Sequence, residues 1–550
     1  MAPRPPKGSD RAPSFPGTEH EPPVAVPDNA AAASPAWRPS ASPWVIAASV
    51  MLATFMEVLD TSVANVSLPH IAGSLAATNE EALWVLTSYL VSNAIVLPAT
   101  GWFAGAFGRK RFLTTCIVIF TLASVLAGAA TSLGMIIVAR VIQGAGCGAL
   151  QPLAQAVLLE SFPPDRRGVA MAVYGMGVVV APIVGPTLGG WITDNYSWRW
   201  IFYINLPVGL LAVLMTQTFV EDPPYLRGGR RGRIDYLGFG LMAVGLAALQ
   251  ILLDKGQEAD WFASVTMRWL AVIGVLGLAG FVVRELTTEA PIVQLRIVSN
   301  RNFAVGLLLI TVMGAVLYAS LSLLPLFLQT LLGYPALQSG MATSPRGLGA
   351  LASMLVVGRL VGRVDGRLLI ATGFGGLAVA TFMLGRLDLD VAMGNIVLPN
   401  VIAGFAMGFI FVPLTTLALG MLRNDQLGGA TGLYNLMRNL GGSVGIAATT
   451  TLLARAAQRH QALLVGHLTP ENPVYLDQLG ALTAALTPQL GAGAGEQATA
   501  LIYQTLLRQA MLLAYIDNFR LIALVCLLCV PLAFLFRRVR ARPDAAAAVH

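Results

Sequence analysis

Long apolar runs dominate the chain from about residue 44 to residue 537, and short polar stretches separate them. A helix needs about 20 predominantly apolar residues to cross a bilayer. Counted on that basis, the runs predict fourteen membrane-spanning helices and an all-α polytopic membrane protein. They lie near residues 44–67, 82–104, 112–130, 134–158, 169–191, 200–219, 235–253, 268–286, 303–331, 338–361, 368–386, 394–420, 429–453 and 519–536.

Composition and charge agree with this pattern. Of the 550 residues, 56% are hydrophobic and 11% are charged, which is more apolar surface than a soluble fold can bury. The formal net charge of +7 does not indicate a nucleic-acid-binding protein, because the basic residues lie in short clusters between apolar runs. The sequence has no HExxH zinc motif and no GxxxxGK[ST] phosphate loop. We therefore expect no enzyme, metal or cofactor, but a transport protein driven by an ion gradient.

The basic clusters predict the topology. An even number of spans puts both termini on one side, and short cytoplasmic loops carry an excess of Lys and Arg. The clusters at 108–111, 165–168, 227–233, 358–367 and 537–542 all fall on the side of the termini, which we expect to be cytoplasmic.

One connection, residues 455–515, is far longer than the others and is predicted on the outer side. Long loops are usually functional or disordered. Residues 496–513 have an amphipathic helical pattern, so both a partner-docking role and a plain surface excursion remain open.

The spans group into two halves. The inner loops at 101–111 and 358–367 resemble each other, which favours duplicated bundles around a central path. The predicted parts are a disordered cytoplasmic tail (1–43), an N-terminal six-helix bundle (44–219), two extra spans with linkers (220–300), a C-terminal six-helix bundle (301–540) and a cytoplasmic tail (541–550).

Two carboxylates interrupt the first apolar run. At 100° per residue, Glu57, Asp60 and Asn65 fall on one arc of the predicted helix. A charge at the centre of a membrane helix costs about 2.5–3.5 kcal/mol, so it almost always faces a bundle interior or a water-filled cavity. Asp60 is the candidate proton site. Glu57 is either a second proton site or part of the cavity lining.

Arg140 in the fourth span is the candidate counter-charge, because it lies at a depth similar to that of Asp60, with Gln143 one turn away. An Asp beside an Arg is held ionised. If the helices part or substrate intervenes, desolvation favours uptake of a proton. We predict proton coupling through Asp60, Glu57 and Arg140, with a static buried salt bridge as the alternative.

Other polar residues in apolar runs are candidates for a substrate cavity. Arg438 lies mid-span with Asn435 and Asn439 nearby, whereas Arg346 lies closer to an outer edge, where snorkelling to the interface is an equal alternative. The predicted cavity residues are Asn65, Gln143, Arg346, Asn435, Arg438 and Asn439.

Small residues mark two further candidates. Residues 177–191 carry small residues four apart, which permit close helix contact, and prolines that kink a membrane helix. The predicted contact residues there are Gly185, Pro186, Gly189 and Gly190. The other is the inner loop after the second span, with residues Gly101, Gly105, Gly108, Arg109, Lys110 and Arg111. Cys526 and Cys529 have a CxxC spacing, but no His or second CxxC accompanies them, so they are predicted to be neutral small hydrophobic residues in a lipid-facing helix rather than a metal or redox pair.

Several motifs resemble one known family. The strings "LDTSVANVSLP" (Leu59 to Pro69), "RVIQG" (Arg140 to Gly144), "GPTLGGWI" (Gly185 to Ile192) and "WRWIFYINLPVG" (Trp198 to Gly209) resemble the major facilitator superfamily, in particular its 14-span drug:proton antiporters. The strings "GWFAGAFG", "LDKGQEADWF" and "VPLTTLALG", with the long outer connection, are similar to the inner-membrane subunit of Emr-type tripartite multidrug efflux pumps.

The resemblance implies a major facilitator fold, two six-helix bundles plus two additional helices, in the bacterial inner membrane. It also implies proton-driven export of hydrophobic or amphipathic compounds, working with a periplasmic adaptor and an outer-membrane channel. The resemblance also implies that the inner loop at residues 101–111 is a cytoplasmic gate. This loop departs from the superfamily pattern, because Gly105 and Ala106 stand where an Asp and an Arg are usual. An exporter of a specific metabolite, siderophore or fatty acid, and a non-transporting receptor or scaffold on the same fold, remain alternatives.

Overall fold

The computed structural model describes residues 39–163, 166–223, 235–289, 291–420 and 422–537. The predicted tails, apart from residues 39–43, lie outside this part of the chain, as do the basic cluster at 227–233 and parts of those at 165–168 and 537–542. Within the described ranges the secondary structure is helical, apart from an isolated bridge between Val361 and Val364.

The first half of the chain contributes six membrane helices, two of which are broken by a short kink. The fourth is interrupted after Cys147, and the sixth at Ile204. They are α1 (Pro43–Ser74), α3 (Trp84–Phe107), α4 (Arg109–Gly128), α5 with α6 (Leu133–Cys147 and Leu150–Ser161), α7 (Arg167–Asn195) and α8 with α9 (Trp200–Tyr203 and Asn205–Phe219); the short α2 (Asn79–Ala82) precedes α3.

Two helices follow, α11 (Tyr236–Lys255) and α12 (Val265–Thr287), which pack on each other as a pair. Asp235 caps the N-terminus of α11 by accepting a hydrogen bond from Gly238 N, and its carboxylate also pairs with Arg284 of α12. That hydrogen-bonded pairing with the Arg284 guanidinium lowers the pKa of Asp235. Contacts of α11 with α3 and with α18 place this pair against both halves of the chain.

The second half begins with α13 (Arg301–Leu326), which ends in a π-helical turn at Phe327–Leu331. The elements that follow are α14 with α15 (Ala336–Thr343 and Pro345–Leu360), α16 (Gly366–Leu384), α17 (Met393–Leu419), α18 (Asn424–Val465), α19 (Pro473–Leu490) and α20 (Ala494–Leu532). Among them the helix α14–α15 is broken, and α18 and α20 are the two longest, with the shorter α19 between them.

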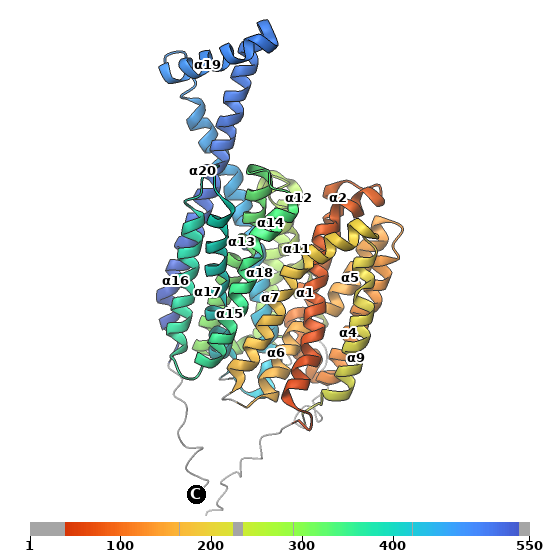
Figure 1. Ribbon diagram of the computed structural model, residues 1–550. Helices are drawn as coiled ribbons and strands as arrows, with labels where there is room; N and C mark the ends of the chain where they lie inside the picture. The colour runs from red at the N-terminus through yellow and green to blue at the C-terminus, as the bar shows by residue number, and fades with distance from the viewer. Residues whose placement is uncertain (1–38, 164–165, 224–234, 290, 421, 538–550) are drawn as a thin grey trace, which may run out of the picture. The chain divides into compact units, whose positions relative to one another are not determined.

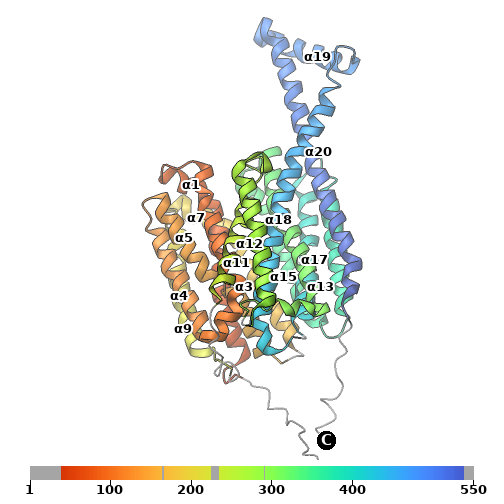
Figure 2. The same cartoon turned by 180° about the vertical axis from the view of Figure 1, so that it is seen from behind.

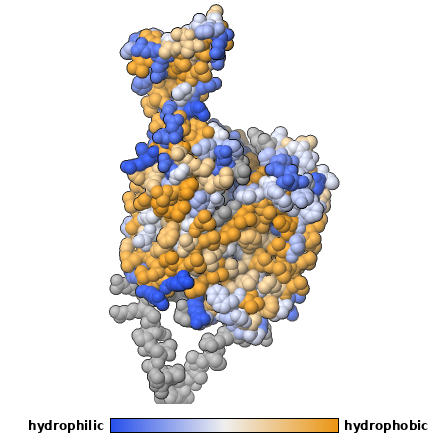
Figure 3. Space-filling view, in the orientation of Figure 1, coloured by the Kyte–Doolittle hydropathy of each residue, from blue (hydrophilic) through white to orange (hydrophobic). Residues whose placement is uncertain are grey.

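The number of spans agrees with the sequence. Twelve helical stretches in the described residues are long and apolar enough to cross a membrane. Two helical segments that are not among these twelve pack against them, namely α14–α15, which is broken before Pro345, and α18. They bring the total to the fourteen predicted. Leucines and valines with largely exposed side chains cover the outside of the helices, and Figure 3 shows this apolar belt between more hydrophilic ends.

The connection predicted at 455–515 is mostly helical, and α20 covers the helical stretch expected at 496–513, whereas the helices before residue 494 were not predicted. Helix α18 continues to Val465, α19 follows, and α20 begins at Ala494, well before the predicted span. The segment is rich in Ala, Leu and Gln, which favour helix without being apolar enough to read as membrane-spanning. We call residues 456–516 the helical extension, and Figures 1 and 2 show it projecting from one end of the bundle.

We call the end of the bundle from which the helical extension projects the extension end. The opposite end is the terminal end. Helix α1 begins and α20 finishes at the terminal end (Figure 1). The two halves of the chain meet closely there, because a Cβ on Gly101 of α3 would overlap the backbone of Gly429 in α18. Likewise a Cβ on Gly168 of α7 would lie 2.6 Å from Val361.

Packing within the second half predicts a clear stability effect. In Gly404→Ala, the added methyl would overlap the carbonyl oxygen of Arg346. The free energy of unfolding of this variant should therefore fall by about 1–3 kcal/mol. Gly375→Ala in α16 is the matched control, since a Cβ there meets no atom within 4 Å. Thermal unfolding of the detergent-solubilised chain should show a lower Tm for Gly404→Ala and an unchanged or higher Tm for Gly375→Ala. Equal Tm values for the two variants would contradict this packing.

Candidate functional site: two buried polar networks

A buried ion pair joins α1 to α5. The Arg140 Nη1 atom donates to Asp60 Oδ2 at 2.6 Å, and the two side chains are 0% and 1% exposed. Both charges must therefore be compensated by groups within the protein. Asp60 and Arg140, which the sequence placed at similar depths in the membrane, are thus in direct contact.

Neighbouring amides complete the environment of Asp60. Gln143 Nε2 donates to Asp60 Oδ1 at 2.9 Å, and Asn205 Nδ2 of α9 donates to the same oxygen at 2.7 Å. Asn205 also reaches Ser124 Oγ of α4 at 3.0 Å. The carboxylate thus receives three hydrogen bonds, and α1, α5 and α9 converge on it.

Arg140 is positioned by more than its partner carboxylate. Its Nε donates to the Val85 carbonyl of α3 at 3.1 Å, and its Nη1 also donates to Gln143 Oε1 at 2.8 Å. The guanidinium lies over the Tyr89 ring, 4.1 Å from its centroid. Nη2 has no hydrogen-bond partner among the described residues. Arg140 therefore links Asp60 of α1 to the backbone of α3.

A second network starts at Glu57, one turn from Asp60 on α1. Gln151 Nε2 of α6 donates to Glu57 Oε1 at 3.0 Å, and Arg438 of α18 donates to Gln151 Oε1. Asn435 Nδ2 of α18 donates to Gln155 Oε1 of α6 at 2.8 Å. Gln151 and Gln155 of the first half thus contact Arg438 and Asn435 of the second half. Within the described residues, Glu57 Oε2 has no hydrogen-bond partner that meets the same distance and angle criteria.

The other predicted cavity residues lie apart from these networks. Asn65 is exposed on α1, and no side-chain hydrogen bond to it is recorded in the described part of the chain. Asn439 has an unpartnered buried Oδ1. Arg346 is buried at 8% exposure rather than snorkelling outward, and its Nε and Nη2 have no partners among the described residues. It is thus a buried cation that stands apart from both polar networks.

The glycines of residues 177–191 have different surroundings. A Cβ on Gly185 would overlap the Ser62 side chain, and one on Gly189 would lie 2.8 Å from Val63, so α7 contacts α1 closely there. A Cβ on Gly190 would meet no atom within 4 Å, and Pro186 is exposed. The close contact therefore involves two of the four predicted residues.

The predicted gating loop is held by carboxylates that sequence reasoning did not single out. Arg109 forms an ion pair with Glu160 at the end of α6 and also donates to the Asn424 carbonyl at the start of α18, at 3.3 Å. Lys110 N donates to Asp222 Oδ1 at 2.9 Å, beside Gly108, whose φ is +85°. Gly105 meets nothing within 4 Å, and Arg111 is exposed. Glu160 and Asp222 therefore supply negative charge near a loop that lacks its usual Asp.

Several contributors to the networks were missed by sequence reasoning. Asn205, Gln151, Gln155 and Tyr89 are polar groups inside apolar runs, and that isolation was the available signal. Cys526 and Cys529 are free thiols and are buried, at 0% and 2% exposure, while Leu524 and Leu528 of the same helix are exposed. No cluster of His, Cys, Asp and Glu suited to a metal occurs within the described residues.

The coupling between Asp60 and Arg140 predicts non-additive stability effects. Removing one partner of a buried pair costs about 3–5 kcal/mol, because the remaining charge is uncompensated, whereas replacing both is far less costly. Arg140→Gln should lower the Tm strongly, and Asp60→Asn/Arg140→Gln should recover part of the loss. Arg284→Gln is the control, since its half-exposed pair with Asp235 should contribute at most about 1 kcal/mol. Strictly additive Tm changes at Asp60 and Arg140 would refute the coupling.

Comparisons with known proteins fit this arrangement. Residues 50–446 match the profile of the Major Facilitator Superfamily. The multidrug export protein EmrB of Escherichia coli (strain K12) is 40% identical over 435 residues, covering 78% of this chain and 84% of EmrB. The fatty acid resistance protein FarB of Neisseria gonorrhoeae is 36% identical over 501 residues, covering 91% and 97%.

Solved structures share the fold. The human organic anion transporter MFSD10 aligns with a TM-score of 0.56 at 14% identity, covering 88% of this chain and 99% of that one. The proton:xylose symporter XylE aligns with a TM-score of 0.56 at 16% identity, covering 90% and 99%. The chain therefore belongs to the major facilitator superfamily, and it is a multi-pass membrane transport protein rather than an enzyme.

Proposed function

We propose that this chain is a proton-coupled antiporter that exports hydrophobic or amphipathic drugs and other toxic compounds across the bacterial inner membrane by alternating access. The single observation that carries the proposal is the Asp60 carboxylate, 2% exposed inside a membrane helix and held by Arg140, Gln143 and Asn205. Buried ionisable groups in membrane helices mark proton and substrate pathways.

The coupling step follows from the charge balance at Asp60. While the carboxylate is ionised, it compensates Arg140 and fixes the three helices around it. A proton on Asp60 removes that compensation, so Arg140 needs another partner and its hold on α3 weakens. Because α3 packs against α18, this change acts on the contact between the two halves of the chain.

The second network is the proposed substrate-facing part. Gln151 bridges Glu57 and Arg438 across the two halves, and Asn435 meets Gln155 beside it. A bound compound that separates the halves would have to replace these hydrogen bonds. Substrate and the closed arrangement therefore compete for the same polar groups.

Alternating access is supported by the contacts at the terminal end. Gly101 and Gly168 approach the second half of the chain so closely that no Cβ fits, and Arg109 joins Glu160 to the start of α18. We assign this end to the cytoplasm, with both termini there, because the basic residues of the loop after α3 lie at it. Two six-helix bundles, residues 44–219 and 301–540, would rock about this contact, with α11 and α12 beside them.

The proposed assembly has three components. The helical extension projects from the extension end, which is periplasmic in this topology, and offers a surface for an adaptor that connects to an outer-membrane channel. The similarity to the multidrug export protein EmrB and the family resemblance support drug export. Energy comes from the proton gradient, without a cofactor.

A second candidate substrate class is fatty acids. The match to the fatty acid resistance protein FarB extends over 91% of this chain, against 78% for EmrB. Arg346 is buried and two of its nitrogens lack partners among the described residues, and a carboxylate would compensate such a cation. A medium-chain fatty acid should therefore be tested beside a cationic dye.

The proton-coupling proposal is tested by Asp60→Asn in proteoliposomes. Asn keeps the size and hydrogen-bonding capacity of the side chain but cannot titrate, so dye efflux driven by an imposed pH gradient should fall to the level of empty vesicles. Asp388→Asn is the control, because Asp388 is exposed at the extension end. Gradient-driven efflux that persists in the Asp60 variant, with normal protein content, would refute coupling at this residue.

The closing contact at the terminal end predicts a different effect. In Gly101→Ala the methyl would overlap the backbone of Gly429, and overpacking of this kind costs about 1–3 kcal/mol. That would lower the population of the closed arrangement by about tenfold and slow efflux. Gly105→Ala, one turn along the same helix, meets no atom within 4 Å and should transport normally. Equal efflux rates would exclude the Gly101–Gly429 contact as part of the cycle.

A further inference from the structure

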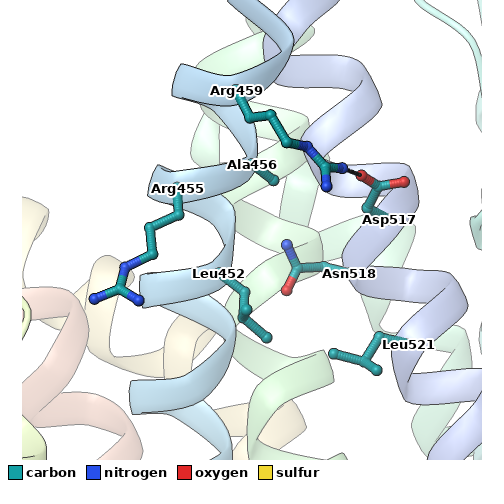
Figure 4. Close-up of a pocket in the computed structure, with 7 residues that line it drawn as sticks. All are labelled: Leu452, Arg455, Ala456, Arg459, Asp517, Asn518 and Leu521. Atoms are coloured by element: carbon teal, nitrogen blue, oxygen red, sulfur yellow. Dashed lines mark hydrogen bonds and ion pairs between the residues drawn. The ribbon is translucent and has the colours of Figure 1, made fainter.

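A cavity lies at the base of the helical extension, away from both polar networks. It has a volume of about 240 Å³ and lies between α18 and α20. A single water needs only about 15 Å³, so this space is much larger than a bridging water would fill. Figure 4 shows the residues that line it: Leu452, Arg455, Ala456, Arg459, Asp517, Asn518 and Leu521.

The depth of the cavity corresponds to the edge of a bilayer. No charged residue occurs on α20 and the turn after it between Arg520 and Arg537, a stretch of about 24 Å at 1.5 Å per residue. Arg520 Nε donates to the Gly385 carbonyl at 3.2 Å, directly after the end of α16. The cavity therefore lies where the apolar belt ends, at the level of the lipid headgroups.

The lower wall is apolar and open to the side. Leu452 and Leu521 are each 40% exposed, so the cavity is accessible from the surrounding lipid. Leu524 and Leu528 continue the exposed apolar surface along α20, at 51% and 59% exposure. A hydrocarbon chain that enters the cavity would find apolar contact along this surface.

The upper part carries an excess of positive charge. Asp517 is the one carboxylate that lines the cavity, and its Oδ2 accepts from Arg459 at 3.1 Å and contacts His460 Nε2 at 2.8 Å. Arg455 is exposed, and no ion pair or hydrogen bond of its side chain is recorded within the described residues. Two arginines, Arg455 and Arg459, face this one carboxylate, so the local charge is positive.

A buried acceptor without a donor points into the same space. Asn518 is 2% exposed, and its Nδ2 donates to the Ala514 carbonyl at 2.9 Å, whereas its Oδ1 has no partner in the described chain. Figure 4 shows the amide directed between the two helices. An unsatisfied buried acceptor is costly, so a ligand that supplies a hydroxyl donor would relieve it.

We propose that this cavity binds an anionic phospholipid of the periplasmic leaflet that carries a hydroxyl-bearing headgroup, such as phosphatidylglycerol. The phosphate contacts Arg455, a headgroup hydroxyl donates to Asn518 Oδ1, and an acyl chain lies along Leu452 and Leu521. The lipid would fill the gap where α18 and α20 leave the membrane and so hold the base of the helical extension.

The test is native mass spectrometry of the full-length chain titrated with phosphatidylglycerol. Loss of a charge-assisted hydrogen bond predicts about tenfold weaker binding in Arg455→Gln. Arg386→Gln is the matched control, because Arg386 lies at the same end but stacks on Phe382 outside the cavity. Asn518→Leu should weaken phosphatidylglycerol but leave phosphatidylcholine, which lacks a headgroup donor, unchanged.

Two further arms distinguish the sources of a phosphate group. Inorganic phosphate at millimolar concentration should not displace the bound lipid; full displacement would mean that the cavity is a free-anion site and would overturn the proposal. Equal retention of phosphatidylglycerol by the Arg455 and Arg386 variants would overturn it as well. Neither result depends on transport, so failure here is separate from failure of the antiport proposal.

Discussion

The cost of charge inside a membrane is the constraint on which this structure depends. Asp60 and Arg140 are tolerated there only because each compensates the other, and because Gln143, Asn205 and the Val85 carbonyl satisfy most of their remaining hydrogen-bonding groups. These partners come from α1, α3, α5 and α9. The pair therefore fixes the relative position of helices that apolar packing alone would allow to slide.

The two polar networks differ in what they join. The Asp60 network lies within the first half of the chain, whereas the Glu57 network crosses to α18 through Gln151 and Arg438. Glu57 and Asp60 are one turn apart on α1, so one helix takes part in both. Helix α1 therefore contacts both the polar groups within the first half and those that join it to the second half.

Glycines set how closely the halves approach. Gly101 and Gly168 have no room for a Cβ toward the second half, while Gly185 and Gly189 bring α7 onto α1 within the first half. Small residues therefore allow close helix packing both inside the first half and between the two halves. The ion pair of Arg109 with Glu160 adds a polar contact at the same end.

The sequence by itself determined the membrane class, the fourteen spans and the location of the buried charges, because apolar runs and isolated charged residues are visible one helix at a time. It also indicated the Asp60–Arg140 pair from their depths. Only the tertiary structure decided that Asn205 and Gln151 complete the networks, that Glu160 pairs with Arg109, that Asn65 lies outside the networks, and that the residues before the helix expected at 496–513 are mostly helical too. Those outcomes depend on which faces of distant helices meet, and a helix's own periodicity does not specify its neighbours.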